Sequence, residues 1–300
     1  MICFKHFRFQ FAVIVLLLVL FPIVMKTNAD ANPPLQQYEI PRSVVHKVKS
    51  IETGRTYEIF VRTPRGYDNE SNETKKYPVV YLNDGPYTFQ VASGVTHIPE
   101  FGSQYEGVIL VGISYAQGEN PRASRTRDLT PSKSTDWRIT SGHKPGGAAE
   151  YLTFLEDRLM PFVEREYRID ANRRTLAGHS FGGLFAAWVM LTKPALFENY
   201  IISSPSLWFG NKMMFGLEED YASSHEDLNA TVYLGTGELE QTRGIANLTA
   251  DHIAFVEQLR SRNYPNLKLR SLILKDIDHM TAFPINFTRA SRWIFYSLRQ

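Results

Sequence analysis

The sequence predicts an α/β protein whose mostly parallel central sheet is covered by helices on both faces. Segments with strand patterns alternate with segments whose apolar residues recur at helical spacing. Several strand segments are short β-branched runs with little polar alternation, which suits strands buried on both faces. The 300 residues are 43% hydrophobic and 21% charged, which is ordinary for a globular protein. Residues 43–300 are therefore expected to form a single α/β domain.

The N-terminus has the pattern of a targeting segment. A few basic residues precede an almost wholly apolar stretch, residues 9–25, and small residues then form an A-x-A cleavage site. This pattern predicts a secretory signal peptide over residues 1–31 and therefore a secreted or periplasmic protein. The alternative is that residues 1–31 are retained as a membrane anchor, through which the chain would contact the membrane. Gln10 and Pro22 disfavour this alternative. Residues 32–42 are polar and rich in proline, as in a linker.

The charge and cysteine content exclude several classes of function. Removing the predicted signal peptide takes away three of the 33 basic and one of the 31 acidic residues, which leaves no net charge. Without basic runs, nucleic acid is not an expected partner. The single cysteine, Cys3, lies in the predicted signal peptide, and no H-E-x-x-H motif is present. We therefore expect no metal site and no cofactor.

The first half of the domain is predicted to begin with a hairpin. Apolar residues alternate over residues 44–48 and 57–61, which suits two antiparallel strands. The β-branched runs at 77–84 and 107–115 then predict buried parallel strands. Apolar residues recur at helical spacing over residues 148–167, which predicts a helix.

The second half alternates more regularly between the two kinds of element. The predicted strands are residues 174–178, 199–205, 230–237 and 267–276. The predicted helices are residues 182–192, 245–262 and 285–299.

The stretch Gly178-His179-Ser180-Phe181-Gly182 lies between a predicted buried strand and a predicted apolar helix. A serine in this context sits on a very tight strand-to-helix turn, where side chains two residues before and after it would collide. Such a turn lifts the Ser180 hydroxyl above the sheet and points the helix N-terminus at the group that it attacks. Ser180 is therefore predicted to be a nucleophile, and the Phe181 N–H to be an oxyanion donor. His179 is expected to point to the other side of the turn.

A serine nucleophile needs a base, and histidine is the usual one. Of the eight histidines, His279 lies between the last predicted strand and the last predicted helix. In α/β-hydrolases the chain order is serine, acid and histidine, and the histidine occupies this loop. His279 is therefore predicted to be the base.

An acid should follow the preceding strand and bind the other nitrogen of the base. Glu238 and Glu240 both follow the strand at 230–237, and spacing alone leaves both open. Asp276 and Asp278 are too close to His279 in sequence and are expected to cap the loop. Nucleophile, acid and base would then meet where parallel strands end, at one edge of the sheet.

The second oxyanion donor should come from the loop after the strand at 77–84. Pro86 has no N–H, so the candidates are Gly85 and Tyr87, of which we expect Tyr87. The candidates for the substrate pocket wall are Arg125, Arg127 and Trp208. Arg127 could equally form an ion pair with the adjacent Asp128.

Six stretches along the chain resemble the putative-esterase family of α/β-hydrolases, which includes enterochelin and salmochelin esterases and S-formylglutathione hydrolase. They are "YPVVYLNDG", "RTRDLTPS", the segment from Phe154 to Ala186, "SSPSLWF", "GELE" and "DHMTAFP". The stretches "RTRDLTPS" and "SPSLWF" resemble the siderophore-esterase branch in particular.

The resemblance implies a serine esterase that hydrolyses carboxylic esters through a Ser-His-Glu acyl-enzyme mechanism. Its implied partner is a small-molecule ester, and a catecholate siderophore lactone is the implied substrate. In the siderophore-esterase branch the acid is a glutamate three residues after a glycine, which matches Gly237 and Glu240. The resemblance therefore favours Glu240 over Glu238.

Two other classes of function use the same fold. One is an acyltransferase or an esterase that removes acetyl or feruloyl groups from polysaccharides. The other is a non-catalytic binding protein, such as a siderophore carrier. The second is disfavoured because the serine, the histidine and both glycines of the turn are all present.

Overall fold

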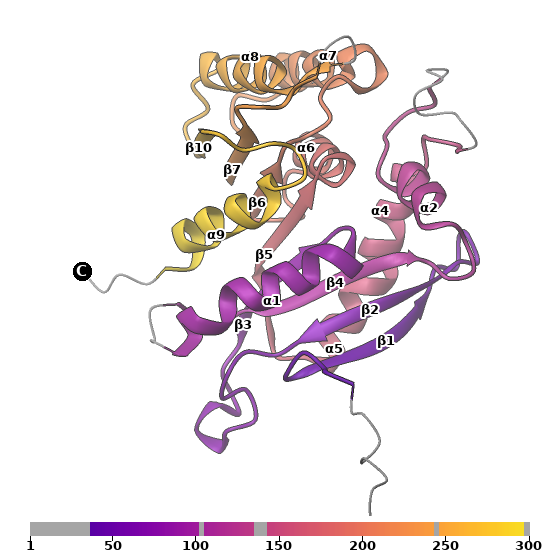
Figure 1. Cartoon of the computed structure of the whole chain (residues 1–300), viewed down its shortest axis with the longest axis vertical. Coiled ribbons are helices and arrows are strands. Elements are labelled where there is room, and N and C mark those ends of the chain that lie inside the picture. Colours follow the sequence, from indigo (N-terminus) through magenta and orange to yellow (C-terminus); the bar gives the residue numbers. More distant parts are fainter. Residues whose placement is uncertain (1–36, 102–104, 135–142, 243–245, 297–300) are drawn as a thin grey trace, which may run out of the picture. The chain divides into compact units, whose positions relative to one another are not determined.

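Eight strands form one sheet in the order β1-β2-β4-β3-β5-β6-β7-β10 in the computed structural model (Figure 1). β2 pairs antiparallel with β1 and β4, and every other neighbouring pair is parallel. The strands are β1 Ser43–Lys49, β2 Thr56–Arg62, β3 Tyr77–Leu82, β4 Ile109–Ala116, β5 Ile169–His179, β6 Asn199–Ser203, β7 Ala230–Gly237 and β10 Leu267–Leu274. The predicted mostly parallel sheet is therefore confirmed.

The structure describes residues 37–101, 105–134, 143–242 and 246–296. Residues Glu39–Gln300 make up one compact unit. The predicted signal peptide, residues 1–31, lies outside the described residues. So do residues 32–36 of the predicted linker, which spans residues 32–42. No helix in the described ranges has both the length and the apolar character needed to cross a membrane.

The helices follow the strands in the expected alternation, with three that the sequence did not predict. The region predicted as one helix contains α4 Ala148–Phe154, a π-helical turn η2 Leu155–Leu159 and α5 Met160–Glu166. The other predicted helices are α6 Phe181–Thr192, α8 Leu248–Ser261 and α9 Ala282–Phe295. The additional helices are α1 Gly85–Phe101, α2 Pro121–Asp128 and α7 Phe209–Ser224. Short elements η1 Glu70–Asn72, β8 Gln241–Thr242 and β9 Ala246–Asn247 complete the described chain.

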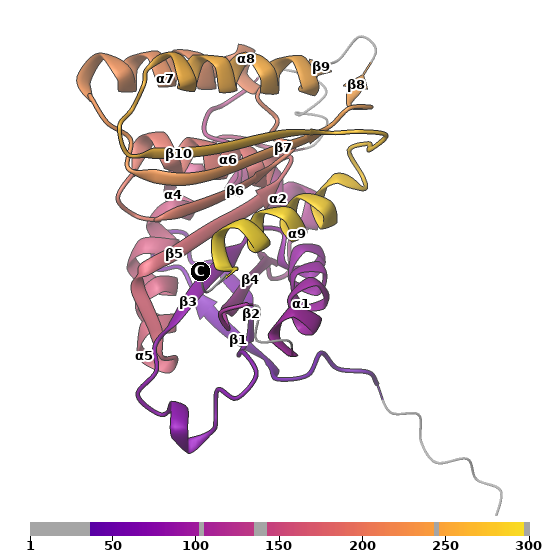
Figure 2. The same ribbon diagram turned by 90° about the vertical axis from the view of Figure 1, so that its left-hand side faces the viewer.

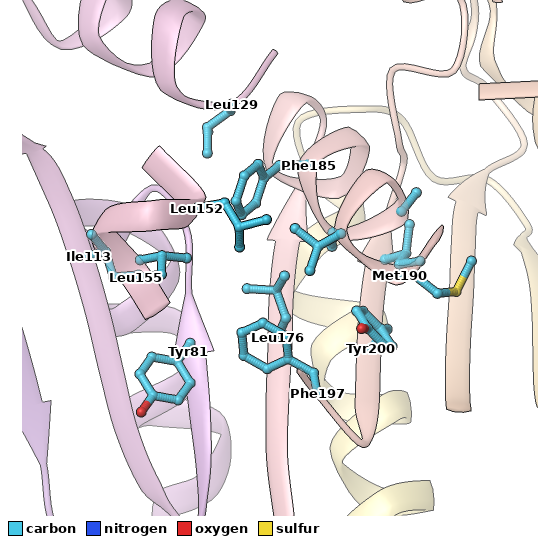
Figure 3. Packing of buried hydrophobic residues seen from close by; sticks show 14 of the residues in the cluster. Tyr81, Ile113, Leu129, Leu152, Leu155, Leu176, Phe185, Met190, Phe197 and Tyr200 are labelled. Atoms are coloured by element: carbon cyan, nitrogen blue, oxygen red, sulfur yellow. The ribbon is translucent and has the colours of Figure 1, made fainter. Parts of the chain in front are cut away.

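The helices cover the sheet on both faces. α1 and α9 lie side by side on one face, where Phe89 and Phe283 belong to one buried apolar cluster (Figure 2). On the other face, residues of α4 to α8 pack in a second cluster around Tyr81, Leu176 and Phe185 (Figure 3). β3 is buried along its whole length, as expected for a parallel strand between two helical layers.

Candidate active site

Ser180 lies on the turn that joins β5 to α6. Its φ of 60° and ψ of −116° are strained for a residue other than glycine. A Cβ atom at Gly178 would lie 2.2 Å from the carbonyl carbon of Gly182, and one at Gly183 would lie 2.7 Å from the Ser203 carbonyl oxygen. The glycines therefore permit the tight turn and the close packing of α6, for the steric reasons that the sequence predicted.

His279 lies on the loop between β10 and α9, and Glu240 on the turn after β7. The Nδ1 atom of His279 is 2.6 Å from Oε2 of Glu240, and Glu240 is only 3% exposed. The other carboxylate oxygen, Oε1, accepts hydrogen bonds of 2.6 Å from the Ser204 hydroxyl and from the Gly237 N–H. Because a carboxylate accepts, Nδ1 of His279 carries the proton, and a neutral ring then has Nε2 available to accept one.

The electrostatics keep this carboxylate ionised. Burial works to raise the pKa of Glu240, but the hydrogen bonds that its oxygens accept, first of all the one from His279, hold the pKa below its ordinary value. The neighbouring carboxylates take other partners. Glu238 is exposed and accepts a hydrogen bond from the Asp276 N–H, and Asp278 caps its own loop by accepting from the Thr281 N–H.

The ring of His279 lies against the residue before Ser180. The ring centroids of His179 and His279 are 4.5 Å apart, which corrects the expectation that His179 points away. Side chains alternate along β5, so His179 shares the face of Ala177, which packs with residues of α9. The loop carrying His279 leads into α9 and brings the His279 ring to this same side.

Ser180 Oγ has Ser206 Oγ as its hydrogen-bonding neighbour, at 3.3 Å. In enzymes without bound substrate, the bond between nucleophile and base is often loose and tightens in the complex. The structure therefore places His279 beside the serine turn, through its contact with His179, and not in a hydrogen bond with Ser180.

Two candidate oxyanion donors differ in their availability. Phe181 is the first residue of α6, where backbone N–H groups have no partner within the helix. The N–H of Tyr87, in contrast, donates to the Asp84 carbonyl oxygen at 3.0 Å. The expectation for Tyr87 is corrected on this ground, because the first turn of α1 uses its N–H. Gly85, the other candidate in this loop, then becomes the preferred donor.

The loop after β3 lies against the first turn of α6. A Cβ atom at Gly182 would lie 3.3 Å from Cβ of Asn83 and 3.4 Å from Oδ2 of Asp84. A Cβ atom at Gly85 would lie 2.8 Å from the backbone of Ile113, so glycine is required there for close contact with β4. The two donor regions are therefore neighbours.

Two of the predicted pocket-wall residues, Arg125 and Trp208, lie beside Phe181. Arg125 binds Asp84 through two hydrogen bonds, of 2.8 and 3.0 Å, and its Cζ lies 5.3 Å from the centroid of the Phe181 ring. The Trp208 ring centroid is 6.2 Å from that of Phe181. Arg127 instead pairs with Asp128 on its own helix, which supports the ion-pair interpretation.

Two residues of the site, Ser204 and Ser206, were not predicted from the sequence. The Ser204 hydroxyl bonds to Glu240 and the Ser206 hydroxyl to Ser180. The family resemblance of "SSPSLWF" was the one signal that pointed to this segment.

Among the described residues, no three or more histidine, cysteine or acidic side chains are grouped so as to hold a metal ion.

The strained serine turn, the histidine and the buried carboxylate follow the carboxyl ends of β5, β10 and β7, which is the chain order of a serine hydrolase with the α/β-hydrolase fold. The family model described as putative esterase matches residues 50–268, and the chain belongs to this family. The protein is a serine ester hydrolase.

Its relatives include named esterases. The chain is 30% identical over 283 residues to the ferri-bacillibactin esterase BesA of Bacillus subtilis (strain 168), covering 90% of this chain and 94% of that protein. It is 35% identical over 171 residues to a siderophore enterobactin esterase of Emericella nidulans, covering 52% and 55%. The crystal structure of the BES protein from Bacillus cereus has a TM-score of 0.76 and 28% identity, covering 89% of this chain and 100% of that one.

Proposed function

We propose that Ser180 is the nucleophile of this esterase, His279 its general base and Glu240 the acid that orients the base. The observation that carries the proposal is the 2.6 Å bond between His279 and a buried carboxylate, beside the serine turn. The bond fixes the ring in the tautomer whose Nε2 can take a proton. Glu240 also stabilises the imidazolium that this transfer creates.

The reaction proceeds through an acyl-enzyme. The Ser180 oxygen bonds to the ester carbonyl carbon while His279 takes the serine proton. The bond to the alcohol oxygen then breaks, and His279 gives its proton to that oxygen, which releases the alcohol. Water attacks the acyl-enzyme as His279 takes one of its protons. Collapse of the second intermediate returns that proton to Ser180 and releases the carboxylic acid.

The oxyanion of each tetrahedral intermediate is held by backbone donors. The Phe181 N–H at the start of α6 is the first, and the Gly85 N–H in the loop after β3 is the second. The N-terminal end of a helix favours negative charge, and Phe181 begins α6. Each such donor typically contributes about 3–4 kcal/mol to transition-state stabilisation.

The proposed substrate is an ester of a siderophore. Its support is the likeness to a ferri-bacillibactin esterase across 94% of that protein. The wall formed by Arg125, Phe181 and Trp208 suits an aromatic acyl group, because a guanidinium and aromatic faces attract π systems. A catecholate acyl group has this chemistry.

Covalent labelling and a substrate panel test the proposal. A fluorophosphonate should label the protein at Ser180, and Ser180→Ala should remain unlabelled. The panel compares a catecholate trilactone, an aryl acetate and a feruloyl sugar. Preferred turnover of the trilactone supports the siderophore assignment, whereas preferred turnover of the feruloyl sugar would replace it with a polysaccharide esterase. Absence of labelling in folded protein would overturn the assignment of Ser180.

We also propose export of the protein, on the basis of the signal-peptide pattern at residues 1–31. Fractionation of a bacterial host that expresses the full chain tests it. Protein in the periplasm or medium, with an N-terminus at Asp30 or Asn32, is the expected result. A membrane fraction that holds the uncut chain would indicate an anchor instead.

A further inference from the structure

Three buried serine hydroxyls lie close together in the chain, one at the end of β6 and two in the segment that leads from β6 to α7. Ser203, Ser204 and Ser206 are 0%, 0% and 2% exposed, so each hydroxyl must find its partner within the protein. The hydroxyls of Ser204 and Ser206 contact Glu240 and Ser180 directly, and that of Ser203 contacts His179, whose ring packs on His279. Pro205 lies between the last two and fixes its own φ, which restricts their relative placement.

Ser204 holds the acid from a strained backbone position. Its φ is 43°, a conformation that glycine adopts without steric cost and that serine rarely adopts. Its N–H donates to the Gly235 carbonyl oxygen at 2.7 Å, and its hydroxyl donates to Glu240 Oε1 at 2.6 Å. The hydroxyl is the group that glycine lacks, so the bond to Glu240 explains why serine occupies this position.

Ser206 contacts the nucleophile through both its side chain and its backbone. Its Oγ is 3.3 Å from Ser180 Oγ, and its N–H donates to the Ser180 carbonyl oxygen at 3.2 Å. The Ser180 N–H in turn donates to the Ser203 carbonyl oxygen at 3.0 Å. The segment therefore holds both the strained turn and the reacting oxygen.

Ser203 reaches the base through the ring of His179. The Asn286 Nδ2 group donates to Ser203 Oγ at 2.8 Å and to the Gly235 carbonyl oxygen at 3.0 Å, which fixes the orientation of this buried amide. Ser203 Oγ lies 3.0 Å from Nδ1 of His179, and that ring packs on His279. Burial, together with the neighbouring His279, lowers the pKa of His179 to about 3, so this ring is neutral near pH 7 and its Nδ1 can accept the Ser203 hydroxyl proton.

We propose that the Ser203–Ser206 segment is the positioning element of the active site, with one hydroxyl for each member of the triad. Ser204 fixes Glu240, Ser206 orients the Ser180 oxygen, and Ser203 fixes the ring on which His279 packs. This inference rests on the proposed triad. Ser203 and Ser204 act through other residues and are positioning residues. Ser206 touches the reacting oxygen itself and is catalytic.

The pair Ser204→Ala and Ser204→Gly separates the hydroxyl from the backbone strain. Both variants lose the bond to Glu240, and only glycine relaxes the positive φ. We expect kcat to fall about tenfold in both, with KM within about twofold of the parent, as expected for a lost charge-assisted hydrogen bond. Ser204→Gly should also melt at a higher temperature than Ser204→Ala. Equal kcat losses despite different stabilities are not expected of a merely structural residue.

Ser206→Ala and Ser203→Ala test the other two contacts. We expect each to slow labelling by a fluorophosphonate and to lower kcat several-fold, with little change in KM. Ser50→Ala is the matched control, because Ser50 is a fully buried serine whose hydroxyl donates to a carboxylate, Glu52, in the β1–β2 hairpin. Its kcat and labelling rate should equal those of the parent.

Two results would overturn the inference. One is parental kcat and labelling rate in all the folded Ser203, Ser204 and Ser206 variants. The other is recovery of parental kcat in Ser204→Gly, which would make strain rather than the hydroxyl responsible. Fluorophosphonate labelling of the parent distinguishes failure of this inference from failure of the proposed triad. If the triad is wrong, the parent itself is not labelled at Ser180.

Discussion

The Nδ1 atom of His279 lies 2.6 Å from Oε2 of Glu240, and Glu238, two residues earlier, is exposed and bonds to the Asp276 N–H instead. Two glutamates that sequence spacing leaves equivalent thus have different surroundings. The turn after β7 directs one carboxylate into the protein and leaves the other in solvent. This difference makes the choice of acid testable.

Glu240→Gln should lower kcat by about 10²- to 10⁴-fold, because a glutamine amide can donate to Nδ1 and stabilise the wrong tautomer of His279. Glu238→Gln is the matched control and should keep the parental rate. Steady-state kinetics on an aryl ester measures both. Similar rates for the two variants would mean that Glu240 does not orient the base.

The steric need for glycine at the serine turn gives a second prediction. In Gly178→Ala the new Cβ would lie 2.2 Å from the carbonyl carbon of Gly182, so the turn must shift. We expect a stability loss of about 1–3 kcal/mol from overpacking, together with loss of most of the activity. Urea unfolding and ester turnover measure the two effects.

Gly216→Ala is the control for that substitution. Gly216 lies inside α7, and a Cβ atom there would meet nothing within 4 Å. The helix should gain about 0.5–1 kcal/mol, because alanine loses less backbone entropy than glycine on folding. A folded Gly178→Ala enzyme with parental activity would contradict the proposed role of the turn.

The sequence predicted the strands well because the parallel strands are buried on both faces. Runs such as "YPVVYL" are apolar throughout, and β3 is buried over its full length. β5 is longer than predicted, since the polar stretch before residue 174 also joins the sheet, where Ile169 pairs with Tyr77. Polar side chains near a strand end do not prevent backbone pairing.

Three helices could not be predicted, each for a physical reason. α1 begins at Gly85-Pro86 and contains Pro99, which are signals of a turn or a helix end. α2, with the sequence "PRASRTRD", has no large apolar residue that would mark a buried face. In α7, residues 210–212 have positive φ and interrupt the helical pattern. Tertiary packing determines these helices rather than periodicity.

At the site, sequence order predicted His279 and left Glu238 and Glu240 open, and the structure has His279 hydrogen-bonded to Glu240. The positions of Ser180 and His279 relative to strand ends brought them to one edge of the sheet. The use of the Tyr87 N–H by Asp84 and the direction of His179 depend on one turn and one strand register. Neither leaves a pattern in a single sequence.

The two hydrogen bonds from Arg125 to Asp84 give a third prediction. They tie α2 to the loop that contains Gly85, the proposed oxyanion donor. Arg125→Lys replaces a planar fork by a point charge and loses the paired geometry. We expect kcat on a simple aryl ester to fall about tenfold. Arg127→Lys, on the same helix, is the control and should leave kcat near the parental value.

The buried side chain of His252 is expected to make the stability of the protein depend on pH. His252 lies on α8, and its buried ring bonds to both β7 and β10, with Nδ1 2.8 Å from Thr236 Oγ1 and Nε2 2.7 Å from Ser271 Oγ. Burial lowers its pKa to about 4, whereas an unfolded histidine has a pKa near 6.5. Between about pH 6.5 and 4 the unfolded chain therefore binds more protons than the folded one, so stability falls as the pH is lowered through this window. The loss of folding stability from this residue levels off below pH 4 at about 3 kcal/mol.

Urea unfolding measures this effect. The midpoints at pH 7.5, 5.5 and 4.5 should decrease in the parent and decrease less in His252→Gln, whose side chain at position 252 cannot titrate. Equal pH slopes in the two proteins would show that His252 is not the group responsible.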